Sequence, residues 1–318
     1  MTHLRHLPLG YGGEFDIISA ALERWGSLAS GIGDDCAVLD VPAGERLVLS
    51  VDTAVEGVHF RRSWLSPEEL GYRATVAALS DLAAMAATPT GVAIAMTLPE
   101  AWRVDFLRIC DGIGEAVRTA GAQIIGGDLS RGVELSLTLT VVGHVRTPLS
   151  RHGARPCDAL WVTGRLGGPS LAVRAWERGE VPTPAARERF VRPAARIAAA
   201  RWLADHGATA GLDISDGLIS DAGHLAAAGS VQLVVNLDKV PTVAGVTVEE
   251  AAQGGEEYEL LVAAPASLDA RAFEAACGLP LTCVGAVAPT IPGEPTVETL
   301  RHGVRVTLPR GHDHFPDR

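Results

Sequence analysis

The sequence predicts a two-domain protein of the α/β class, with domains over residues 1–148 and 149–318. Its 318 residues are about twice the usual length of a single domain. Hydrophobic residues make up 47% and charged residues 20% of the chain, a composition typical of a protein that buries a core. In the first half, runs of Val, Ile and Leu alternate with Ala-rich helical segments, the order expected of an α/β domain.

Three strands and two helices are predicted in the first domain. The apolar runs predicted as strands cover residues 46–51, 91–98 and 134–142. Residues 67–87 are predicted as a helix, because Pro67 follows Ser66 and two glutamates occupy the first turn, where the helix dipole favours negative charge. A second helix is expected over residues 101–120, ending before Gly121.

The second domain is predicted to mix strands and helices. Its expected strands cover residues 159–163, 232–237 and 258–263, with a short pair over 295–307. Its expected helices cover residues 169–178 and 194–206. A turn is expected at Gly167–Gly168, and the proline-containing stretch 179–184 is expected to be a loop.

Charge and cysteine content argue against several classes of protein. The formal net charge of −11 is unfavourable for a nucleic-acid or anionic-membrane partner, since either needs a basic face. No apolar run approaches the ~18 residues that span a membrane. The five cysteines are scattered without a CxxC pair, which indicates neither a disulfide framework nor a zinc site and fits a cytoplasmic location. Lys239 is the only lysine, and the Walker A pattern is absent.

Aspartates in apolar surroundings are the unusual feature of the sequence. They lie in five short segments, at Asp34, Asp35, Asp52, Asp81, Asp128, Asp213, Asp216 and Asp221. A single aspartate at a strand end is usually a solvated cap or turn residue. Several of these adjoin apolar sequence, however, where an unpaired charge is costly to bury. Mg²⁺ is bound by such carboxylates together with substrate phosphates. The residues therefore favour a phosphate site with several Mg²⁺ ions, with solvated caps as the alternative.

Other polar residues near the aspartates allow two interpretations each. Gly126 and Gly127 would let backbone N–H groups approach an anion, although glycine pairs mostly mark turns. Arg151 is either a phosphate ligand or a surface residue. His59 ends a strand-like segment, as a site residue or a structural histidine. Glu256 and its acidic neighbour precede an apolar strand, in a binding loop or a solvated turn.

Nine short segments follow one another over nearly the whole chain. They are GEFDII (13–18), GIGDDCAVL (31–39), SVDTAVEGVHF (50–60), ALSDLAAMAATP (78–89), GGDLSRG (126–132), LSRHGARPCDALWVTG (149–164), DISDGLISDAGHL (213–225), GGEEYEL (254–260) and GHDHF (311–315). Together they resemble the thiamine-monophosphate kinase family, in the superfamily of aminoimidazole ribonucleotide synthetase. The resemblance implies a homodimer whose N-terminal α/β domains form a barrel-like sheet interface. It also implies that the C-terminal α/β domain covers a cleft between the domains that holds ATP and several Mg²⁺ ions.

The resemblance also assigns roles by position. The implied metal ligands are Asp35, Ser50, Val51, Asp52, Asp81, Asp128, Asp213 and Asp216. The implied ATP contacts are Gly127, Asp128, Arg151 and Ser215, and the implied thiamine-phosphate contacts are His59, Glu256 and His312. Asp128 and Asp216 are the implied catalytic residues.

Four positions depart from the family pattern. Val51 has no hydroxyl where the family often has threonine, so a metal contact there would use its carbonyl oxygen. Leu129 replaces a polar residue, Glu257 replaces the aspartate of GGEDYEL, and His312 stands where an aromatic residue is common. The central aspartates are unchanged, so the departures concern substrate affinity rather than the reaction.

The implied reaction transfers the γ-phosphoryl group of ATP directly to the phosphate of thiamine monophosphate. This acceptor needs no strong general base, and clustered Mg²⁺ would neutralise and align the two polyanions. One alternative is another ATP-dependent enzyme of the superfamily. A selenophosphate synthetase should carry a reactive cysteine in its glycine-rich N-terminal segment, which residues 9–13 lack, and the hydrogenase-maturation enzyme should end in cysteine. A second alternative is a non-catalytic nucleotide or thiamine-phosphate sensor, against which the intact aspartates argue.

Overall fold

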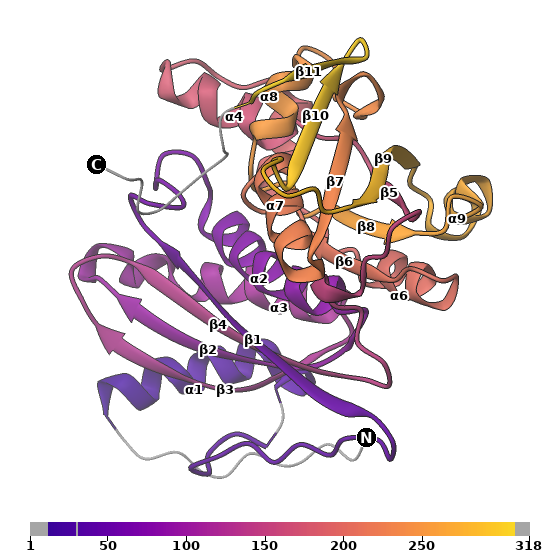
Figure 1. The fold of residues 1–318 in the computed structure, drawn as a ribbon. Coiled ribbons are helices and arrows are strands. Elements are labelled where there is room, and N and C mark those ends of the chain that lie inside the picture. Colours follow the sequence, from indigo (N-terminus) through magenta and orange to yellow (C-terminus); the bar gives the residue numbers. More distant parts are fainter. Residues whose placement is uncertain (1–11, 30, 309–318) are drawn as a thin grey trace. The chain divides into compact units, whose positions relative to one another are not determined.

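The computed structural model describes residues 12–29 and 31–308, and the chain divides into two compact units (Figure 1). The first unit holds the chain up to Leu82 together with Ala87–Thr147, and the second holds Ala83–Ala86 and the chain from Pro148. Each unit has its own sheet with helices, which confirms the predicted α/β class with two domains. Over the described ranges both sheets are open, and neither closes into a barrel within one chain.

A four-stranded sheet with the order β1-β4-β2-β3 forms the first unit. β4 pairs antiparallel with β1 and β2, and β2 pairs parallel with β3. The strands are β1 (Arg46–Val55), β2 (Thr88–Leu98), β3 (Gln123–Arg131) and β4 (Ser136–Val145). The helices are α1 (Gly13–Trp25), α2 (Pro67–Ala84) and α3 (Phe106–Thr119).

The two faces of this sheet differ in exposure. On β2, Ile94 and Met96 are buried, whereas Ala95 between them is exposed. On the edge strand β1, the alternate side chains of Leu47, Leu49 and Val51 are 54%, 60% and 55% exposed. Because successive side chains of a strand point to opposite faces, the sheet has one core face and one open face, which is apolar at β1.

α2 begins where the sequence predicts. The Ser66 hydroxyl accepts the Glu69 N–H at 3.2 Å, and the Glu69 carboxylate accepts the Ser66 N–H at 2.8 Å, which is a capping box. The helix ends at Ala84, not at residue 87, because Ala86 has a left-handed φ of 55°.

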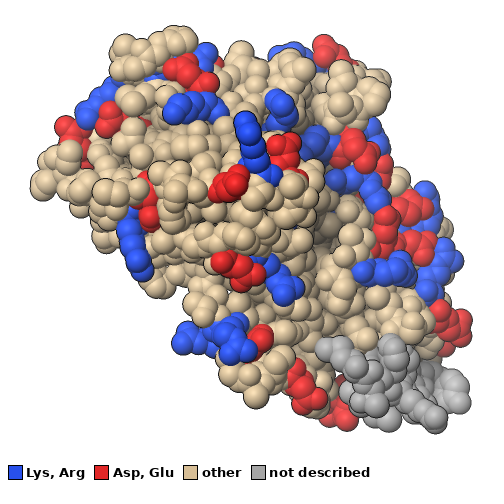
Figure 2. All heavy atoms as spheres, turned by 90° about the vertical axis from the view of Figure 1, so that its right-hand side faces the viewer, with Lys and Arg blue, Asp and Glu red and all other residues tan. Residues whose placement is uncertain are grey.

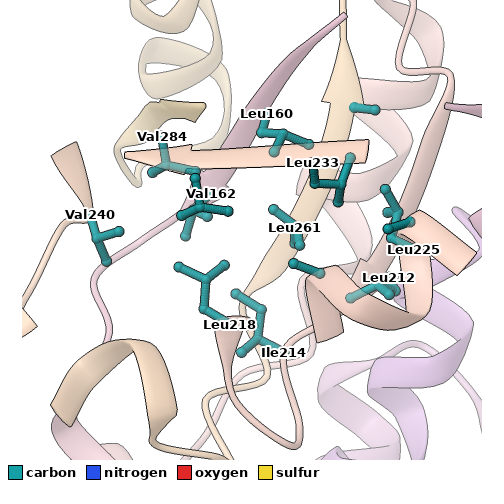
Figure 3. Close-up of a cluster of buried hydrophobic side chains, with 14 of the residues drawn as sticks. Leu160, Val162, Leu212, Ile214, Leu218, Leu225, Leu233, Val240, Leu261 and Val284 are labelled. Carbon is teal, nitrogen blue, oxygen red and sulfur yellow. The ribbon is translucent and has the colours of Figure 1, made fainter. Parts of the chain in front are cut away.

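The second unit is built on a seven-stranded sheet with the order β11-β10-β7-β9-β5-β8-β6. Its strands are β5 (Ala159–Thr163), β6 (Ala210–Asp213), β7 (Val231–Asn236), β8 (Leu260–Ala264), β9 (Leu281–Pro289), β10 (Val297–Arg301) and β11 (Val304–Val306). Its helices are α4 (Gly168–Glu177), α5 (Pro184–Val191), α6 (Ile197–Asp205), α7 (Leu218–Gly229), α8 (Val248–Gln253) and α9 (Ala270–Cys277). Leu160, Leu233 and Leu261 from the strands meet Leu218 and Leu225 of α7 in its core (Figure 3).

The structure adds elements that the sequence patterns did not predict. They are α1, α5, α7, α8, α9, β3, β6 and β9. The predicted loop 179–184 leads directly into α5, because the Thr183 hydroxyl caps its first turn by accepting the Ala186 N–H at 3.3 Å. The predicted helix 101–120 is two elements, since Glu100–Asp105 forms a 3₁₀ helix before α3 begins.

Acidic and basic side chains are interspersed on the face drawn in Figure 2, in small groups of both signs. No helix within residues 12–29 and 31–308 is both long enough and apolar enough to cross a membrane.

Candidate functional site

Ser50 and Asp81 meet in the first unit, as implied for a shared metal site. Ser50 lies on β1 and donates its hydroxyl hydrogen to Oδ2 of Asp81 on α2, at 2.6 Å. Both residues are half-buried. The side chain of Ser50 therefore points to the core face of the sheet, because that is the face on which α2 meets it. Asp52 shares this face by alternation, and its Oδ1 accepts the N–H of Thr53 at 2.8 Å.

The side chain of Asp128 points to the other face of the sheet. The register aligns Asp52 with Leu139, Ile94 and Gly127, whereas Asp128 lies in the next row, level with Ala95. Neighbouring rows point to opposite faces, so one sheet does not bring the two carboxylates side by side. Asp128 is exposed, and its carboxylate accepts the Ser130 hydroxyl at 3.1 Å.

Gly127 lies inside β3, so the glycine pair does not form the turn that was the alternative to an anion-binding role. A Cβ at Gly127 would lie 2.2 Å from the carbonyl oxygen of Ile94 on β2. Any side chain would push the two strands apart, so glycine is required for their close pairing. An apolar pocket of about 80 Å³ reaches this position and is also lined by Trp25, Ile32 and Phe106. The sequence patterns did not indicate this pocket.

The remaining first-unit candidates lie at different places along the chain. Asp35 is exposed in an irregular segment, and its N–H bonds to the Asp34 carboxylate at 2.9 Å. His59 is half-buried in the turn after β1, where its Nδ1 accepts the Val55 N–H at 3.1 Å. This bond gives His59 a structural role at the end of β1. The side chain of Val51 is exposed on the open face.

In the second unit, Asp213, Ser215 and Asp216 lie in one turn between β6 and α7. Asp213 ends β6 and is 5% exposed, and the next two candidates are half-buried. Asp221, in the first turn of α7, holds this turn. Its Oδ2 accepts the N–H groups of Ser215, Asp216 and Gly217 at 3.0, 3.1 and 3.1 Å. A carboxylate that accepts three successive N–H groups fixes the backbone from which Ser215 and Asp216 project.

The charges around this turn repel one another. Burial, together with the neighbouring charges of Asp216 and Asp213, raises the pKa of Asp221 to about 8, although the backbone N–H groups of Ser215 and Asp216 oppose this. Asp216, Asp221 and His224 also present ligand atoms that all lie within 4.8 Å of one another. Carboxylate oxygens, here and separately in the first unit, are the hard donors that Mg²⁺ prefers. The chemistry of the residues present therefore fits the implied metal.

Glu256 lies in a loop that is bonded to this turn. The Glu256 N–H donates to the Ser215 carbonyl at 2.7 Å, and the Tyr258 N–H donates to the Ile214 carbonyl at 2.9 Å. Both Glu256 and Tyr258 have left-handed backbones, with φ of 65° and 53°. Such conformations cost on the order of 1 kcal/mol each outside glycine, so the surrounding contacts must hold them. Glu257 between them is buried, which answers the question left by the sequence: the loop is not a solvated turn at this residue.

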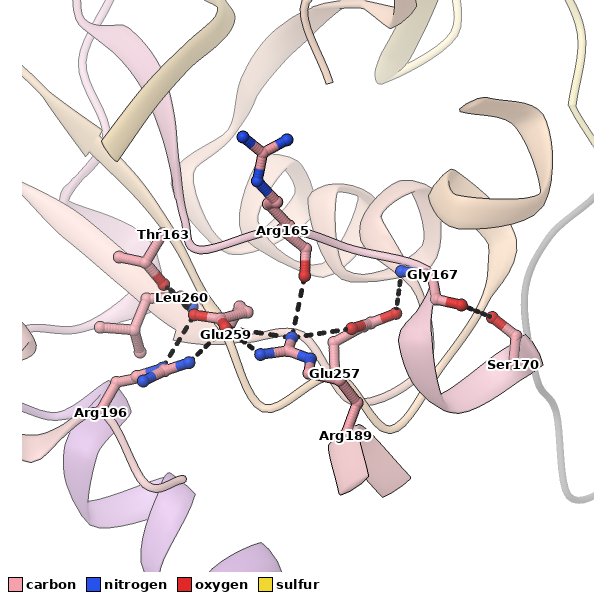
Figure 4. Close-up of polar contacts among 9 residues, drawn as sticks. All are labelled: Thr163, Arg165, Gly167, Ser170, Arg189, Arg196, Glu257, Glu259 and Leu260. Atoms are coloured by element: carbon pink, nitrogen blue, oxygen red, sulfur yellow. Dashed lines mark hydrogen bonds and ion pairs between the residues drawn. The ribbon is translucent and has the colours of Figure 1, made fainter. Parts of the chain in front are cut away.

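A cluster of buried charges adjoins the loop, and sequence reasoning missed most of it (Figure 4). Glu259 accepts bonds from Arg189, Arg196 and Thr163, at 3.1, 2.5 and 2.7 Å for the shortest contact of each. Glu257 accepts a short bond from the Gly167 N–H and lies 3.3 Å from Nη2 of Arg189. Burial raises the pKa of Glu257 to about 8, although the Gly167 N–H and Arg189 oppose this. Only the run of acids in GGEEYE hinted at such a cluster, because its arginines lie more than sixty residues away in sequence.

The last two candidates are Arg151 and His312. Arg151 is exposed in a short 3₁₀ turn, Arg151–Gly153. His312 lies outside the described residues, as does the whole GHDHF segment that contains it.

Comparison with known proteins gives consistent results. Residues 33–145 match the family model of the AIR synthase related protein, N-terminal domain, and residues 155–290 match its C-terminal domain. Thiamine-monophosphate kinase of Salmonella typhimurium is 36% identical over 326 residues, which cover 95% of this chain and 98% of the relative. That of Haemophilus influenzae is 32% identical, covering 96% and 98%.

Two solved structures extend the comparison to the fold. Thiamine-monophosphate kinase from Stenotrophomonas maltophilia K279a is 33% identical with a TM-score of 0.79, over 95% of this chain and 99% of the other. AaThiL complexed with AMPPCP and TMP is 30% identical with a TM-score of 0.75, over 97% and 99%. The resemblance carried by the nine sequence segments is confirmed, and the chain belongs to the thiamine-monophosphate kinase family.

Proposed function

We propose that this protein transfers the γ-phosphoryl group of ATP to thiamine monophosphate and so forms thiamine diphosphate. The observation that carries the proposal is likeness over nearly the full length of relatives with this name, at 32–37% identity. The complex of AaThiL with AMPPCP and TMP supports both substrates, because the present chain matches 97% of its own length to that protein. We also propose the functional assignment of the domains, with nucleotide, metal and dimer contacts concentrated in residues 1–148.

We propose that several Mg²⁺ ions bind with the nucleotide. The ligands would be the side chains of Asp35, Ser50, Asp52, Asp81, Asp128, Asp213 and Asp216, with Val51 contributing its carbonyl oxygen. Bound Mg²⁺ supplies charge neutralisation of the phosphates. Asp128 and Asp216 would hold the metal-bound reacting phosphates, and the acceptor phosphate would attack in line without a phosphoenzyme.

Substrate contacts follow the same assignment. Gly127 and Ser215 would bind ATP through groups close to the carboxylates, and Arg151 is exposed and can pair with a phosphate. His59, Glu256 and His312 would contact thiamine monophosphate. The bond between the Glu256 N–H and the Ser215 carbonyl supports a link between acceptor and nucleotide contacts in the second unit.

We further propose a homodimer formed through the open face of the first sheet. Leu47, Leu49 and Val51 are each more than half exposed on an edge strand, and such an apolar row is a liability unless a partner covers it. Two sheets joined in this way would give the barrel-like interface implied by the resemblance. Sedimentation at micromolar concentration would contradict this if it gave the mass of a single chain, 33.2 kDa.

The decisive experiment incubates the purified protein with ATP, MgCl₂ and thiamine monophosphate and measures thiamine diphosphate by chromatography. We expect product to form, to stop completely in excess chelator, and to return when Mg²⁺ is added in excess of the chelator. Reactions with thiamine alone and with no acceptor control for other phosphorylation and for ATP hydrolysis. Absence of thiamine diphosphate in the Mg²⁺-supplied reaction would disprove the proposed function, and product formed in excess chelator would disprove the metal assignment.

A further inference from the structure

The buried charge cluster of the second unit has no part in the proposed reaction, although it adjoins the proposed acceptor loop (Figure 4). The side chains of Glu257 and Glu259 are both fully buried, with 0% of each exposed. Arg189 comes from α5 and Arg196 from the residue before α6. Two glutamates of the loop 254–259 thus meet two arginines from a distant part of the sequence.

Glu259 and Glu257 contact different parts of the second unit. Both oxygens of Glu259 are satisfied by the arginines and Thr163, and the Leu260 N–H bonds to the same threonine at 2.8 Å. These contacts fix the start of β8. Glu257 instead links two other elements, because one oxygen accepts the Gly167 N–H before α4 and the other faces Arg189 of α5. Arg189 also donates to the Arg165 carbonyl at 2.8 Å, which ties the loop before α4 to the same guanidinium.

Glu257 lies between Glu256 and Tyr258 in the loop, and its side chain is anchored to Gly167 and Arg189. The residues on either side of it have left-handed backbones. With the Glu257 carboxyl anchored inward, Glu256 and Tyr258 are held in these unfavourable conformations. Without the anchor, the backbone at Glu256 would relax toward the ordinary region for a side-chain-bearing residue, and the Glu256 carboxylate would move.

The neighbouring nucleotide-side turn has its own support. Ser215, Asp216 and Gly217 are held by Asp221 through three backbone bonds that involve neither Arg189 nor Glu257. Loss of the Glu257 anchor should therefore disturb Glu256 more than the turn that carries Ser215 and Asp216.

We propose that Glu257 and Arg189 are positioning residues that hold Glu256 in the geometry required for binding the acceptor, thiamine monophosphate. The proposal rests on the proposed function of Glu256 and adds residues that touch neither substrate. It also gives a physical role to the glutamate that replaces the usual aspartate: its additional methylene lets one carboxyl reach both Gly167 and Arg189.

The test compares steady-state constants for both substrates in five single variants and in the double variant Glu257→Met/Arg189→Met. Glu257→Met keeps the side-chain length, Arg189→Met keeps much of the apolar stem, and both remove the bonds. Glu257→Gln and Arg189→Lys are the conservative partners, since each retains part of the hydrogen bonding. Arg305→Met is the matched control, because Arg305 pairs with Glu294 and Glu298 on the surface of the same unit. Thermal unfolding and direct calorimetric binding of thiamine monophosphate are measured for each.

We expect each methionine variant to raise KM and Kd for thiamine monophosphate by roughly tenfold, and KM for ATP by no more than about twofold, since small misplacements of a binding group are costly. The double variant should cost no more than the larger single change, because both residues act through one anchor. Glu257→Gln and Arg189→Lys keep part of the bonding, so they should raise KM for thiamine monophosphate by about threefold with KM for ATP unchanged. Arg305→Met should match the wild type.

Three outcomes would overturn the inference while leaving the proposed function intact. In the first, both methionine variants lose thermal stability but keep the wild-type acceptor constants. In the second, KM rises equally for both substrates. In the third, the methionine variants do not fold and the conservative pair, which folds, shows no change in the ratio of the two KM values. A wild-type protein that fails to phosphorylate thiamine monophosphate would instead disprove the proposed function, and with it this inference.

Discussion

Two groups of carboxylates in the second unit lie close in the fold but differ in what balances their charge. Glu259 is enclosed by two arginines and a threonine, so its charge is compensated within the protein itself. Asp221 is held by backbone N–H groups, and its pKa rises through burial and through the nearby charges of Asp216 and Asp213. The first group is complete without a ligand, whereas the second would gain stability from the cation proposed above. The same side-chain chemistry would thus serve structure at one site and ligand binding at the other.

The largest expected effect is on the aspartate turn. Asp216→Asn should lower kcat by a hundredfold or more, roughly 3 kcal/mol of transition-state stabilisation, because a charge that holds the metal-bound phosphates is lost. Asp128→Asn should have a similar effect. Unlike loss of a structural carboxylate, Asp216→Asn should leave the unfolding temperature of the metal-free protein unchanged or higher, since it relieves repulsion with Asp221.

Steady-state kinetics measure kcat, and calorimetry in chelator measures the unfolding temperature of the metal-free protein. Asp238→Asn is the control, because Asp238 pairs with Arg301 on the surface of the same unit and should leave kcat unchanged. Near wild-type kcat in both Asp216→Asn and Asp128→Asn would remove the distinction drawn between the two groups.

Loss of a charge in the glutamate cluster should instead lower the stability of the metal-free protein. Glu259→Gln removes the counter-charge of Arg189 and Arg196, whose side chains are only 29% and 20% exposed. We expect a loss of about 2 kcal/mol in the free energy of unfolding, less than for a fully buried pair because the arginines retain some solvent. Urea denaturation of the metal-free protein measures this loss. A Glu259→Gln protein as stable as the wild type would show that the cluster contributes no net stability.

The smallest expected effect is the pH dependence due to Glu257. Its pKa is about 8 in the folded protein against an ordinary 4.5, so the unfolded chain gives up this proton first as pH rises. The contribution of Glu257 to stability therefore falls between about pH 5 and pH 8 and is level outside that window. Glu257→Gln, which resembles the protonated acid, should have nearly wild-type stability at pH 5 and be more stable than the wild type at pH 8.

Denaturation in chelator at the two pH values gives this difference, and the comparison with wild type cancels other titrating groups. An equal offset between Glu257→Gln and wild type at both pH values would mean that the Glu257 carboxyl is already ionised at pH 5. Burial would then not raise the pKa of Glu257 as it raises that of Asp221.

The family and the general fold could be predicted from local patterns. Continuous apolar runs such as that of β5 were predicted with their correct bounds, because Val and Leu in a short segment favour a buried strand regardless of its partners. The start of α2 was predicted from its capping residues, since a cap acts over three residues. The order of the acidic motifs was sufficient for the family.

Structural features that depend on residues far away in the sequence were predicted less well. The glycine pair of β3 allowed either an anion-binding backbone or a turn, but Gly127 is needed because the backbone of β2 approaches it there. β6 has four residues and leads into the aspartate turn, so it carried too little pattern to be recognised.

What the sequence determined by itself is the identity and order of the carboxylates, since these are fixed by position along the chain. The tertiary structure alone decided which of them are compensated. Asp213, Asp221, Glu257 and Glu259 are all buried acids in the second unit. Only folding brings Arg189 and Arg196 to the glutamates, across more than sixty residues, and only the turn before α7 directs three N–H groups at Asp221. The energy of a buried charge is set by its neighbours in space, and those neighbours are chosen by the fold.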